Sequence, residues 1–226
     1  MIENLSVWEE VFRNKEWGKY PPIPLVRFIA RNYYNVPDRS KIKVLELGAG
    51  TGANLWYLAR EGFTVYAIEY SRTGIEKIKQ RLKQEGLEDR LADIVQGDYF
   101  EVLDNFPDEF FDVIIDIESP CCNNFSKTRA IIEKAVNKLK PDGRFFSITF
   151  ADGTMGLEGG GEVDYHMVVP KYGPLAGLGP QRYTTKEDID KLYKHENTDI
   201  EFIHREDYYY TDKEAIKQWI ISVRKI

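Results

Sequence analysis

The stretch VLELGAGTGANL, residues 44–55, decides the fold. Its first four residues are typical of a buried strand, and glycines follow at positions 48, 50 and 52. Glycines between a strand and a helix remove side chains where a ligand must approach the main chain. The helix N-terminus behind such a turn offers free N–H groups and the positive end of the helix dipole. The stretch therefore predicts a strand–turn–helix unit that binds a nucleotide-like ligand.

Strand-like and helix-like segments alternate along the chain around this unit. Strands are expected at residues 42–48, 64–70, 93–97, 111–117 and 144–150. Helices are expected at residues 53–61, 73–85 and 126–139, the last one closed by residues 140–143. Such alternation indicates a parallel sheet with right-handed crossovers and helices on both faces. Two final strands, at 200–210 and 215–223, are expected to pair antiparallel and end the sheet.

One domain is expected, in four parts. These are an N-terminal helical cap at residues 1–40, a cofactor-binding core at 41–150, a substrate lid insertion at 151–183, and a final helix with an antiparallel strand pair at 184–226. The lid insertion is rich in glycine and weakly periodic, which is typical of a functional or mobile segment. The final helix should begin near Thr184, which stands at capping-box spacing from Glu187.

Composition and charge argue against several classes of protein. The formal net charge of −6 argues against a broad phosphate-binding face. No apolar run approaches the roughly 20 residues of a membrane helix, and the acidic N-terminus lacks signal-peptide features. The two cysteines, Cys121 and Cys122, are adjacent and cannot staple a fold. The charge therefore argues against a nucleic-acid partner, a cytoplasmic protein without membrane association is expected, and a homodimer is left open.

Two further segments suit a nucleotide. Glu69 ends the second expected strand, about 20 residues after the glycines, where a carboxylate can accept from both ribose hydroxyls. Asp98 and Tyr99 follow the third expected strand, and a carboxylate beside an aromatic ring suits an adenine amino group and its π-face.

A dinucleotide such as NAD is an alternative ligand. Gly48, Gly50 and Ala53 fit the dinucleotide fingerprint G-x-G-x-x-G/A. A hydride-transfer enzyme also needs a proton donor, and the one Tyr-x-x-x-Lys pattern, Tyr209 to Lys213, falls in the terminal hairpin, far from the cofactor edge. The NAD reading is therefore the weaker one, but it stays open.

Five motifs resemble, in order and spacing, those of class I S-adenosylmethionine-dependent methyltransferases: VLELGAGTGAN, VYAIEYS, VQGDYF, FDVIIDIES and LKPDGRFFSITF. The resemblance covers residues 40–150 and extends to the last two strands. It implies a Rossmann-like, doubly wound α/β sheet of seven strands, mostly parallel with the last strand antiparallel. It also implies S-adenosylmethionine (SAM) as the cofactor, lying across the carboxyl ends of the strands.

The resemblance implies roles for single residues as well. The methionine part of SAM would face the first motif, at Glu46, Gly48, Gly50 and Gly52. The remaining contacts would be made by Glu69 with the ribose and by Tyr70, Asp98 and Tyr99 with the adenine.

Methyl transfer from a sulfonium is a direct displacement, so alignment of the acceptor supplies much of the rate. A general base helps a hydroxyl acceptor and matters less for an amine. Asp116 and Glu118 would line the mouth of the site by resemblance, and His166 is the one histidine of the lid insertion. These three are the candidate catalytic residues. No metal is expected, because no His, Cys and carboxylate cluster has the spacing of a metal site.

The segment Ser119-Pro120-Cys121-Cys122 has several readings. Cytosine-5 methyltransferases carry a nucleophilic Pro-Cys here, and amino-group methyltransferases carry a motif that begins like Ser119-Pro120. The two cysteines replace the end of that second motif. A thiolate role would need a lowered pKa. The simplest interpretation is a pocket wall of small residues.

The sequence thus predicts a methyltransferase, EC 2.1.1.-, that methylates O or N of a small molecule. A protein or RNA methyltransferase and an NAD-type dinucleotide-binding protein stay open as alternatives. The lid insertion is expected to swing on glycines 153, 156, 159, 160 and 161 and to bring Tyr165, His166 and Tyr172 to the acceptor. Residues 17–22 are expected to act as a second lid piece or to pack against the sheet edge.

Overall fold

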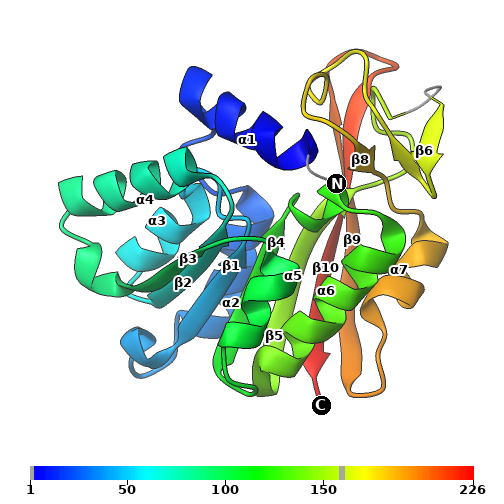
Figure 1. Ribbon diagram of the computed structural model, residues 1–226. Coiled ribbons are helices and arrows are strands. Elements are labelled where there is room, and N and C mark those ends of the chain that lie inside the picture. The colour runs from blue at the N-terminus through cyan, green and yellow to red at the C-terminus, as the bar shows by residue number, and fades with distance from the viewer. Residues whose placement is uncertain (1–2, 158–160) are drawn as a thin grey trace.

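A seven-stranded sheet forms the centre of the protein in the computed structural model, which describes residues 3–157 and 161–226 (Figure 1). The strand order is β3-β2-β1-β4-β5-β10-β9. Neighbouring strands pair in parallel from β3 to β5, and β10 is antiparallel to both β5 and β9. The predicted doubly wound sheet, with its last strand antiparallel, is confirmed. The strands are β1 (Lys43–Leu47), β2 (Thr64–Glu69), β3 (Leu91–Gln96), β4 (Phe111–Ile117), β5 (Leu139–Phe150), β9 (Thr198–Tyr209) and β10 (Ala215–Lys225).

Seven helices flank the sheet in the described ranges: α1 (Glu3–Asn14), α2 (Ile23–Tyr33), α3 (Ala53–Arg60), α4 (Arg72–Gln84), α5 (Tyr99–Val102), α6 (Phe125–Lys138) and α7 (Lys186–Tyr193). Short 3₁₀ turns are η1 (Arg39–Lys41), η2 (Glu88–Arg90), η3 (Leu103–Asn105) and η4 (Pro120–Cys122). None of the described helices is long and apolar enough to cross a membrane.

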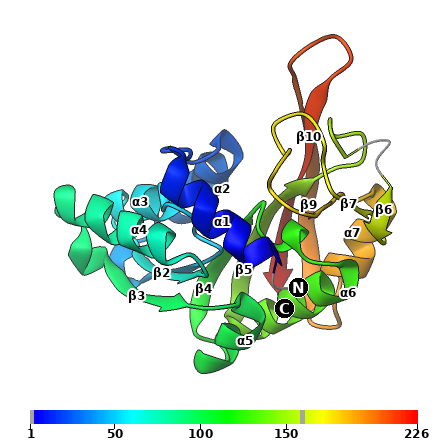
Figure 2. The ribbon, with the colours of Figure 1, turned by 45° about the horizontal axis from the view of Figure 1, so that its top comes forward.

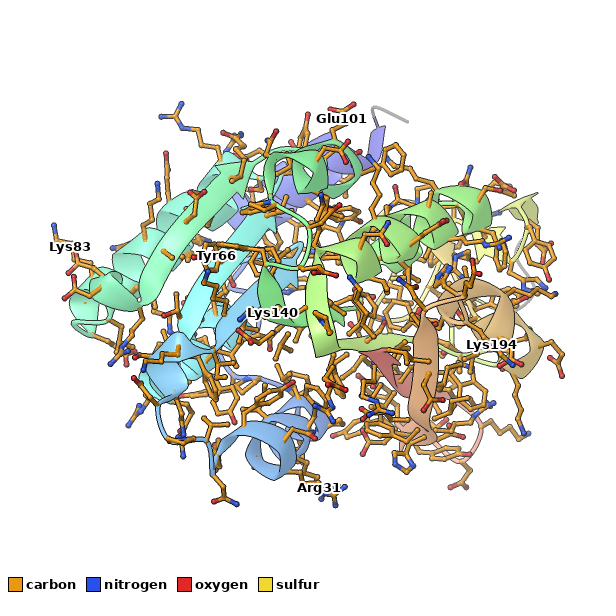
Figure 3. All side chains as sticks on the ribbon, turned by 90° about the horizontal axis from the view of Figure 1, so that it is seen from below. Arg31, Tyr66, Lys83, Glu101, Lys140 and Lys194 are labelled. Carbon is orange, nitrogen blue, oxygen red and sulfur yellow. The ribbon has the colours of Figure 1, made fainter. Side chains whose placement is uncertain are left out.

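Side chains alternate between the two faces of the sheet and so build two cores. Val113 and Ile115 of β4 pack with α2, α3 and α4, whereas Ile114 between them packs with α6 and α7. Tyr66 joins the second core, with rings of Phe106, Phe110 and Phe111 within 6.3 Å. In the view from below, side chains fill the space between sheet and helices, while the labelled Arg31, Lys83 and Lys194 point outward (Figure 3). The helices therefore cover both faces, as predicted.

Most element boundaries agree with the prediction within two residues, and two differences have a clear structural reason. The fifth strand begins at Leu139 rather than 144, because Leu139 pairs with Phe111 before a shift in register. The capping box of α7 lies one residue later than expected, with Thr185 as N-cap and Asp188 at the third helical position. Thr184 cannot serve as the cap because it is buried and its N–H donates to the Phe150 carbonyl at 2.8 Å.

The lid insertion after the fifth strand is mostly irregular, as expected, but it also contains a small sheet that the sequence did not predict. It forms a three-stranded sheet of β6 (Glu162–Asp164), β7 (Met167–Val168) and β8 (Gln181–Arg182), which lies beside the β9–β10 hairpin (Figures 1 and 2). A third core joins it to α1 and β5 through Phe12, Phe150, Leu157, Val168, Leu175 and Leu178. Two of the predicted hinge positions, Gly159 and Gly160, lie outside the described residues. The motion of the lid insertion stays a prediction.

Candidate functional site

A cavity of about 800 Å³ lies at the carboxyl ends of the parallel strands, where doubly wound sheets bind ligands. One side, called here the cofactor half, is lined by Gly48, Gly50, Glu69, Tyr70, Gly97, Asp98 and Tyr99. The structure thus brings together six of the eight predicted cofactor residues. Glu46 and Gly52 do not line the cavity.

Gly50 and Gly52 of the glycine-rich turn serve different structural purposes. Gly50 adopts a φ of 56°, and an added Cβ would point to the Phe12 ring of α1, 3.4 Å away. Gly52 adopts a φ of 84°, and an added Cβ would meet Ile78 of α4 at 2.6 Å. Gly50 therefore keeps the ligand side of the turn free of side chains, whereas Gly52 allows α3 and α4 to pack closely.

Glu69 joins this turn to the start of α4. One carboxylate oxygen accepts from the Gly50 N–H at 2.6 Å, and the other accepts from the Ser71 N–H at 2.7 Å. Burial raises its pKa to about 7. A carboxylate has about four acceptor sites, so two remain for the ribose hydroxyls that the sequence assigned to it. Glu69 both shapes the turn and faces the cavity.

We expect Glu69→Ala to weaken SAM binding by about ten- to a hundredfold, since hydrogen bonds to a charged group contribute roughly 1.5–3 kcal/mol. The substitution also releases the Gly50 N–H. Isothermal titration with SAM measures the loss. Glu76→Ala, an exposed residue of α4 that does not line the cavity, is the matched control. Equal affinity of the two variants would remove Glu69 from the cofactor site.

Asp98 and Tyr99 form another wall of the cofactor half. Asp98 accepts from the Phe100 N–H at 2.8 Å and pairs with Lys127 Nζ at 2.6 Å. The Tyr99 hydroxyl donates to the Ser119 carbonyl at 3.2 Å and accepts from Asn123 Nδ2 at 2.8 Å. Both side chains are held in place by these bonds, which suits the adenine-binding role predicted for them.

Glu46 lies beneath the glycine-rich turn and is only 2% exposed. One oxygen accepts from Asn54 Nδ2 at 2.6 Å, and within the described part of the chain the other has no hydrogen-bond partner. Burial raises its pKa to about 8. The contact with the methionine part of SAM that was predicted for Glu46 stays a prediction.

Glu46→Gln should stabilise the protein at alkaline pH. The pKa of Glu46 rises from 4.5 to about 8 on folding, so the folded state binds more protons between these values and its stability falls as pH rises. The amide removes this loss, and we expect a gain of about 1–3 kcal/mol at pH 8.5 and little change at pH 4.5. Urea unfolding at both pH values is the measurement. A variant less stable than the wild type at pH 8.5 would contradict the argument.

Of the two predicted carboxylates at the end of β4, only Glu118 lines the cavity. Asp116 is buried and accepts from Ser147 Oγ at 2.7 Å and from the Ser119 N–H at 3.0 Å, so it fixes the turn beyond β4. Glu118 has a φ of 58°, unusual for a residue with a side chain, and accepts a hydrogen bond from Gln218 of β10. Burial raises the pKa of each carboxyl to about 7. Glu118 is thus the carboxyl of the pair that faces the cavity, and its role as a base stays a prediction.

His166 lies away from these carboxylates and is absent from the cavity lining. Its Nδ1 lies 2.7 Å from Asp188 Oδ2, and its ring stacks between Tyr165 and Tyr183, with centroids 3.9 and 4.6 Å away. Tyr172 and Tyr165 do not line the cavity either. The histidine therefore ties the turn between β6 and β7 to α7 in this structure, and its role as a base stays a prediction.

The remainder of the cavity, called here the acceptor half, is mainly apolar and aromatic. Its lining includes Trp8, Trp17, Glu118, Phe150, Asp164, Met167, Leu178, Gln181, Glu206, Tyr208, Tyr210, Ile216 and Gln218. Most of these residues were missed from sequence. The period-two spacing of Glu206, Tyr208 and Tyr210 was a usable signal, because alternate residues of a strand share a face.

Helix α1 crosses the carboxyl ends of the strands beside α4 (Figures 1 and 2). Glu9 accepts from Ser71 Oγ at 2.6 Å and from Thr73 Oγ1 at 2.5 Å, and these bonds lower its pKa to about 2. Trp8 and Trp17 contact each other edge to face, with centroids 5.4 Å apart. The N-terminal segment thus forms one wall of the cavity.

The adjacent cysteines lie where β4 meets the lid insertion. The Cys121 thiol donates to the Glu118 carbonyl at 3.1 Å, and both sulfurs lie within 3.7 Å of Gln181 Oε1. The bond with Cys122 and burial raise the pKa of Cys121 well above its usual value. A high pKa argues against a nucleophilic thiolate at Cys121. Within the described ranges, no three His, Cys or carboxylate side chains gather as metal ligands would.

Comparisons with known proteins agree with this geometry. A family model described as "Methyltransferase domain" matches residues 38–213. Demethylmenaquinone methyltransferase of Tropheryma whipplei (strain Twist) is 29% identical over 153 residues, which is 67% of this chain and 60% of that protein. The chain therefore matches less than two thirds of the length of this curated relative.

Two solved structures share the fold. A SAM-dependent methyltransferase of Methanosarcina mazei superposes with a TM-score of 0.70 at 17% identity, covering 88% of this chain and 97% of that one. The 1,6-didemethyltoxoflavin-N1-methyltransferase of Burkholderia thailandensis, solved with its substrate and S-adenosylhomocysteine, gives 0.65 at 16% identity, covering 99% and 84%.

Proposed function

We propose that this chain, which belongs to the methyltransferase domain family, transfers a methyl group to a small-molecule acceptor. The predicted class I methyltransferase is confirmed, and SAM is its cofactor. What we propose is the class of acceptor. The comparisons support it, because the names of the relatives refer to demethylmenaquinone and 1,6-didemethyltoxoflavin, which are small molecules.

One observation carries the proposal: a polar half whose lining suits a nucleotide and a mainly apolar half belong to one cavity of about 800 Å³. This volume lies in the range of small-molecule sites. Gly48 of the cofactor half is close to Ser119, since an added Cβ would lie 1.9 Å from Ser119 Oγ. Glu118, the preceding residue, lines the acceptor half. This proximity supports a role for Glu118 near the junction of the two halves, where we propose that methyl transfer takes place.

Bound SAM supplies the methyl group as an activated sulfonium. The protein contributes alignment, exclusion of water and a place for the proton. Glu69 and the turn around Gly50 hold the cofactor end, and apolar walls such as Phe150 and Met167 orient the acceptor. Asp116 positions the turn at Ser119, and Glu118 accepts the proton that the acceptor loses.

Isothermal titration with SAM, S-adenosylhomocysteine and NAD tests which cofactor the protein binds. We expect the first two to bind and NAD to leave no signal, and binding of NAD alone would overturn the proposal. Release of S-adenosylhomocysteine in the presence of small-molecule, RNA or protein acceptors tests which class of acceptor is methylated. Methylation confined to RNA or protein would favour the alternative class. The cytoplasmic location and the homodimer stay predictions.

A further inference from the structure

We propose that the acceptor half selects an amine, which it binds as a cation. The inference rests on the proposed function and names the substrate class of the same site. It draws on three features of the described residues: the sign of the charges around the cavity, the aromatic rings beside them, and the charge that methyl transfer leaves on the product.

The charges that line the cavity are predominantly negative. Five carboxylates line it in the described part of the chain: Glu69, Asp98, Glu118, Asp164 and Glu206. Lys127 is the one cation among these lining residues, and it is paired with Asp98 in the cofactor half. The acceptor half thus presents three carboxylates and, within the described ranges, no Lys or Arg. A phosphate or carboxylate acceptor would find no charged donor there.

Arg182 of β8 follows the lining residue Gln181, so its positive charge has to be considered as a partner for an anionic acceptor. It is fully buried, and its Nη1 donates to Thr184 Oγ1 at 3.0 Å. Its guanidinium lies 5.8 Å from the centre of the Phe125 ring and does not line the cavity. Its Nε has no hydrogen-bond partner among the described residues, but the side chain does not line the acceptor half.

Aromatic rings accompany the carboxylates. Tyr208 and Tyr210 lie on the same face of the hairpin as Glu206, with ring centroids 5.7 Å apart, and Trp8 and Trp17 line the cavity from the N-terminal segment. A cation within about 6 Å of an aromatic ring is attracted by the negative face of the ring. Aromatic rings combined with carboxylates favour an ammonium group and disfavour an anion.

The charge balance of the reaction points the same way. The bound ammonium first loses a proton to the Glu118 carboxylate. The nitrogen lone pair then forms the new N–C bond while the C–S bond breaks and its electrons stay on sulfur. The product is a methylated ammonium beside a neutral thioether, so positive charge remains near the carboxylates. A phenolate would instead place an anion among three carboxylates. The raised pKa of Glu118, caused by burial, suits a group that must take up this proton.

The test uses three probes of nearly equal shape and different charge: 2-phenylethylamine, 2-phenylethanol and phenylacetate. Each is titrated calorimetrically at pH 8 into the full chain saturated with S-adenosylhomocysteine. We expect the amine to bind about tenfold more tightly than the alcohol, a difference of 1.4 kcal/mol, and phenylacetate to bind weakest.

Glu206→Gln and Asp207→Asn provide a matched pair on one strand. Both remove one negative charge from exposed positions of β9, but Glu206 lines the cavity, whereas Asp207 accepts from Arg205 at 3.1 Å and is absent from the lining. Glu206→Gln should lower the affinity for the amine about threefold or more and leave the alcohol unchanged. Asp207→Asn should change neither.

Four outcomes would overturn the inference: phenylacetate binding as tightly as the amine, the alcohol binding as tightly as the amine, equal effects of the two substitutions, or no binding of any probe. The proposed function fails differently, because it would show no titration with SAM or S-adenosylhomocysteine in the same preparation. A protein that binds the cofactor but shows no preference for the amine would contradict this inference alone.

Discussion

Gly50→Val is expected to abolish SAM binding, with an affinity loss of more than about a hundredfold, while the fold survives. Gly50 has a φ of 56°, a conformation that a β-branched residue strongly disfavours, and an added Cβ already lies 3.4 Å from Phe12. The two γ-methyl groups of valine would extend further into the space beneath α1. They would also disturb the Gly50 N–H that donates to Glu69. Titration with SAM measures the effect.

Gly86→Val controls for the strain in the backbone. Gly86 has a φ of 66°, close to that of Gly50, and an added Cβ there meets nothing within 4 Å. Both variants should therefore lose a similar amount of stability, roughly 1–2 kcal/mol. Only Gly50→Val should lose the cofactor. Full binding by Gly50→Val would place SAM elsewhere, and loss in both variants would attribute the effect to the fold.

Glu118→Gln is expected to lower the turnover number at saturating acceptor by about 10²- to 10⁴-fold, the usual contribution of a general base. The amide preserves the shape of the side chain but cannot accept the proton. His166→Ala, compared in the same assay, decides between two of the predicted bases. A near-normal rate for Glu118→Gln together with a large loss for His166→Ala would give the role to the histidine.

The pH profile separates a base from a residue that only packs. Burial raises the pKa of Glu118 to about 7, so the wild-type turnover number should rise with pH up to about that value and then level off. Glu118→Gln should lose this rise. The groups around Glu118 are Gln218, the Cys121 thiol and Asp116, and Asp116 has a similarly raised pKa. A rise that persists in Glu118→Gln would assign it to Asp116 or to the acceptor.

Local and periodic signals made the sheet predictable. Helices between successive strands indicate that the strands run parallel, and the glycine-rich turn indicates the edge of the sheet at which a ligand binds. The lid insertion lacked such a signal, because its core joins Leu157, Val168 and Leu178 to Phe12 of α1, far away in sequence. β7 has only the two residues Met167 and Val168, so no alternation in the sequence could show that Met167 lines the cavity while His166, in the turn before it, does not.

The start of α7 was misplaced from sequence for a different reason. Thr184 and Thr185 are equally good caps in isolation, and Thr184 is excluded by its burial and by its bonds to Phe150 and Arg182, which no local pattern reveals. Among the site residues, the sequence identified Glu69, Asp98 and Tyr99 through their place at strand ends. It missed Gln181 and Gln218. A polar residue in a strand shows its role only once the packing of that strand against its neighbours is known, and the sequence does not give that packing.

The anchored position of α1 has a consequence for the timing of catalysis. Phe12 and Trp8 of α1 line the same cavity as Gly50 and Glu69, and the hydrogen bonds of Glu9 hold the helix to the start of α4. Under the proposed function, spent cofactor has to leave a site walled by this helix, and we expect its residence time to depend on how often the Glu9 contacts break. The chemistry proposed for Glu118 and the departure of the product would thus be controlled by separate parts of the chain, and the slower of the two would set the turnover number.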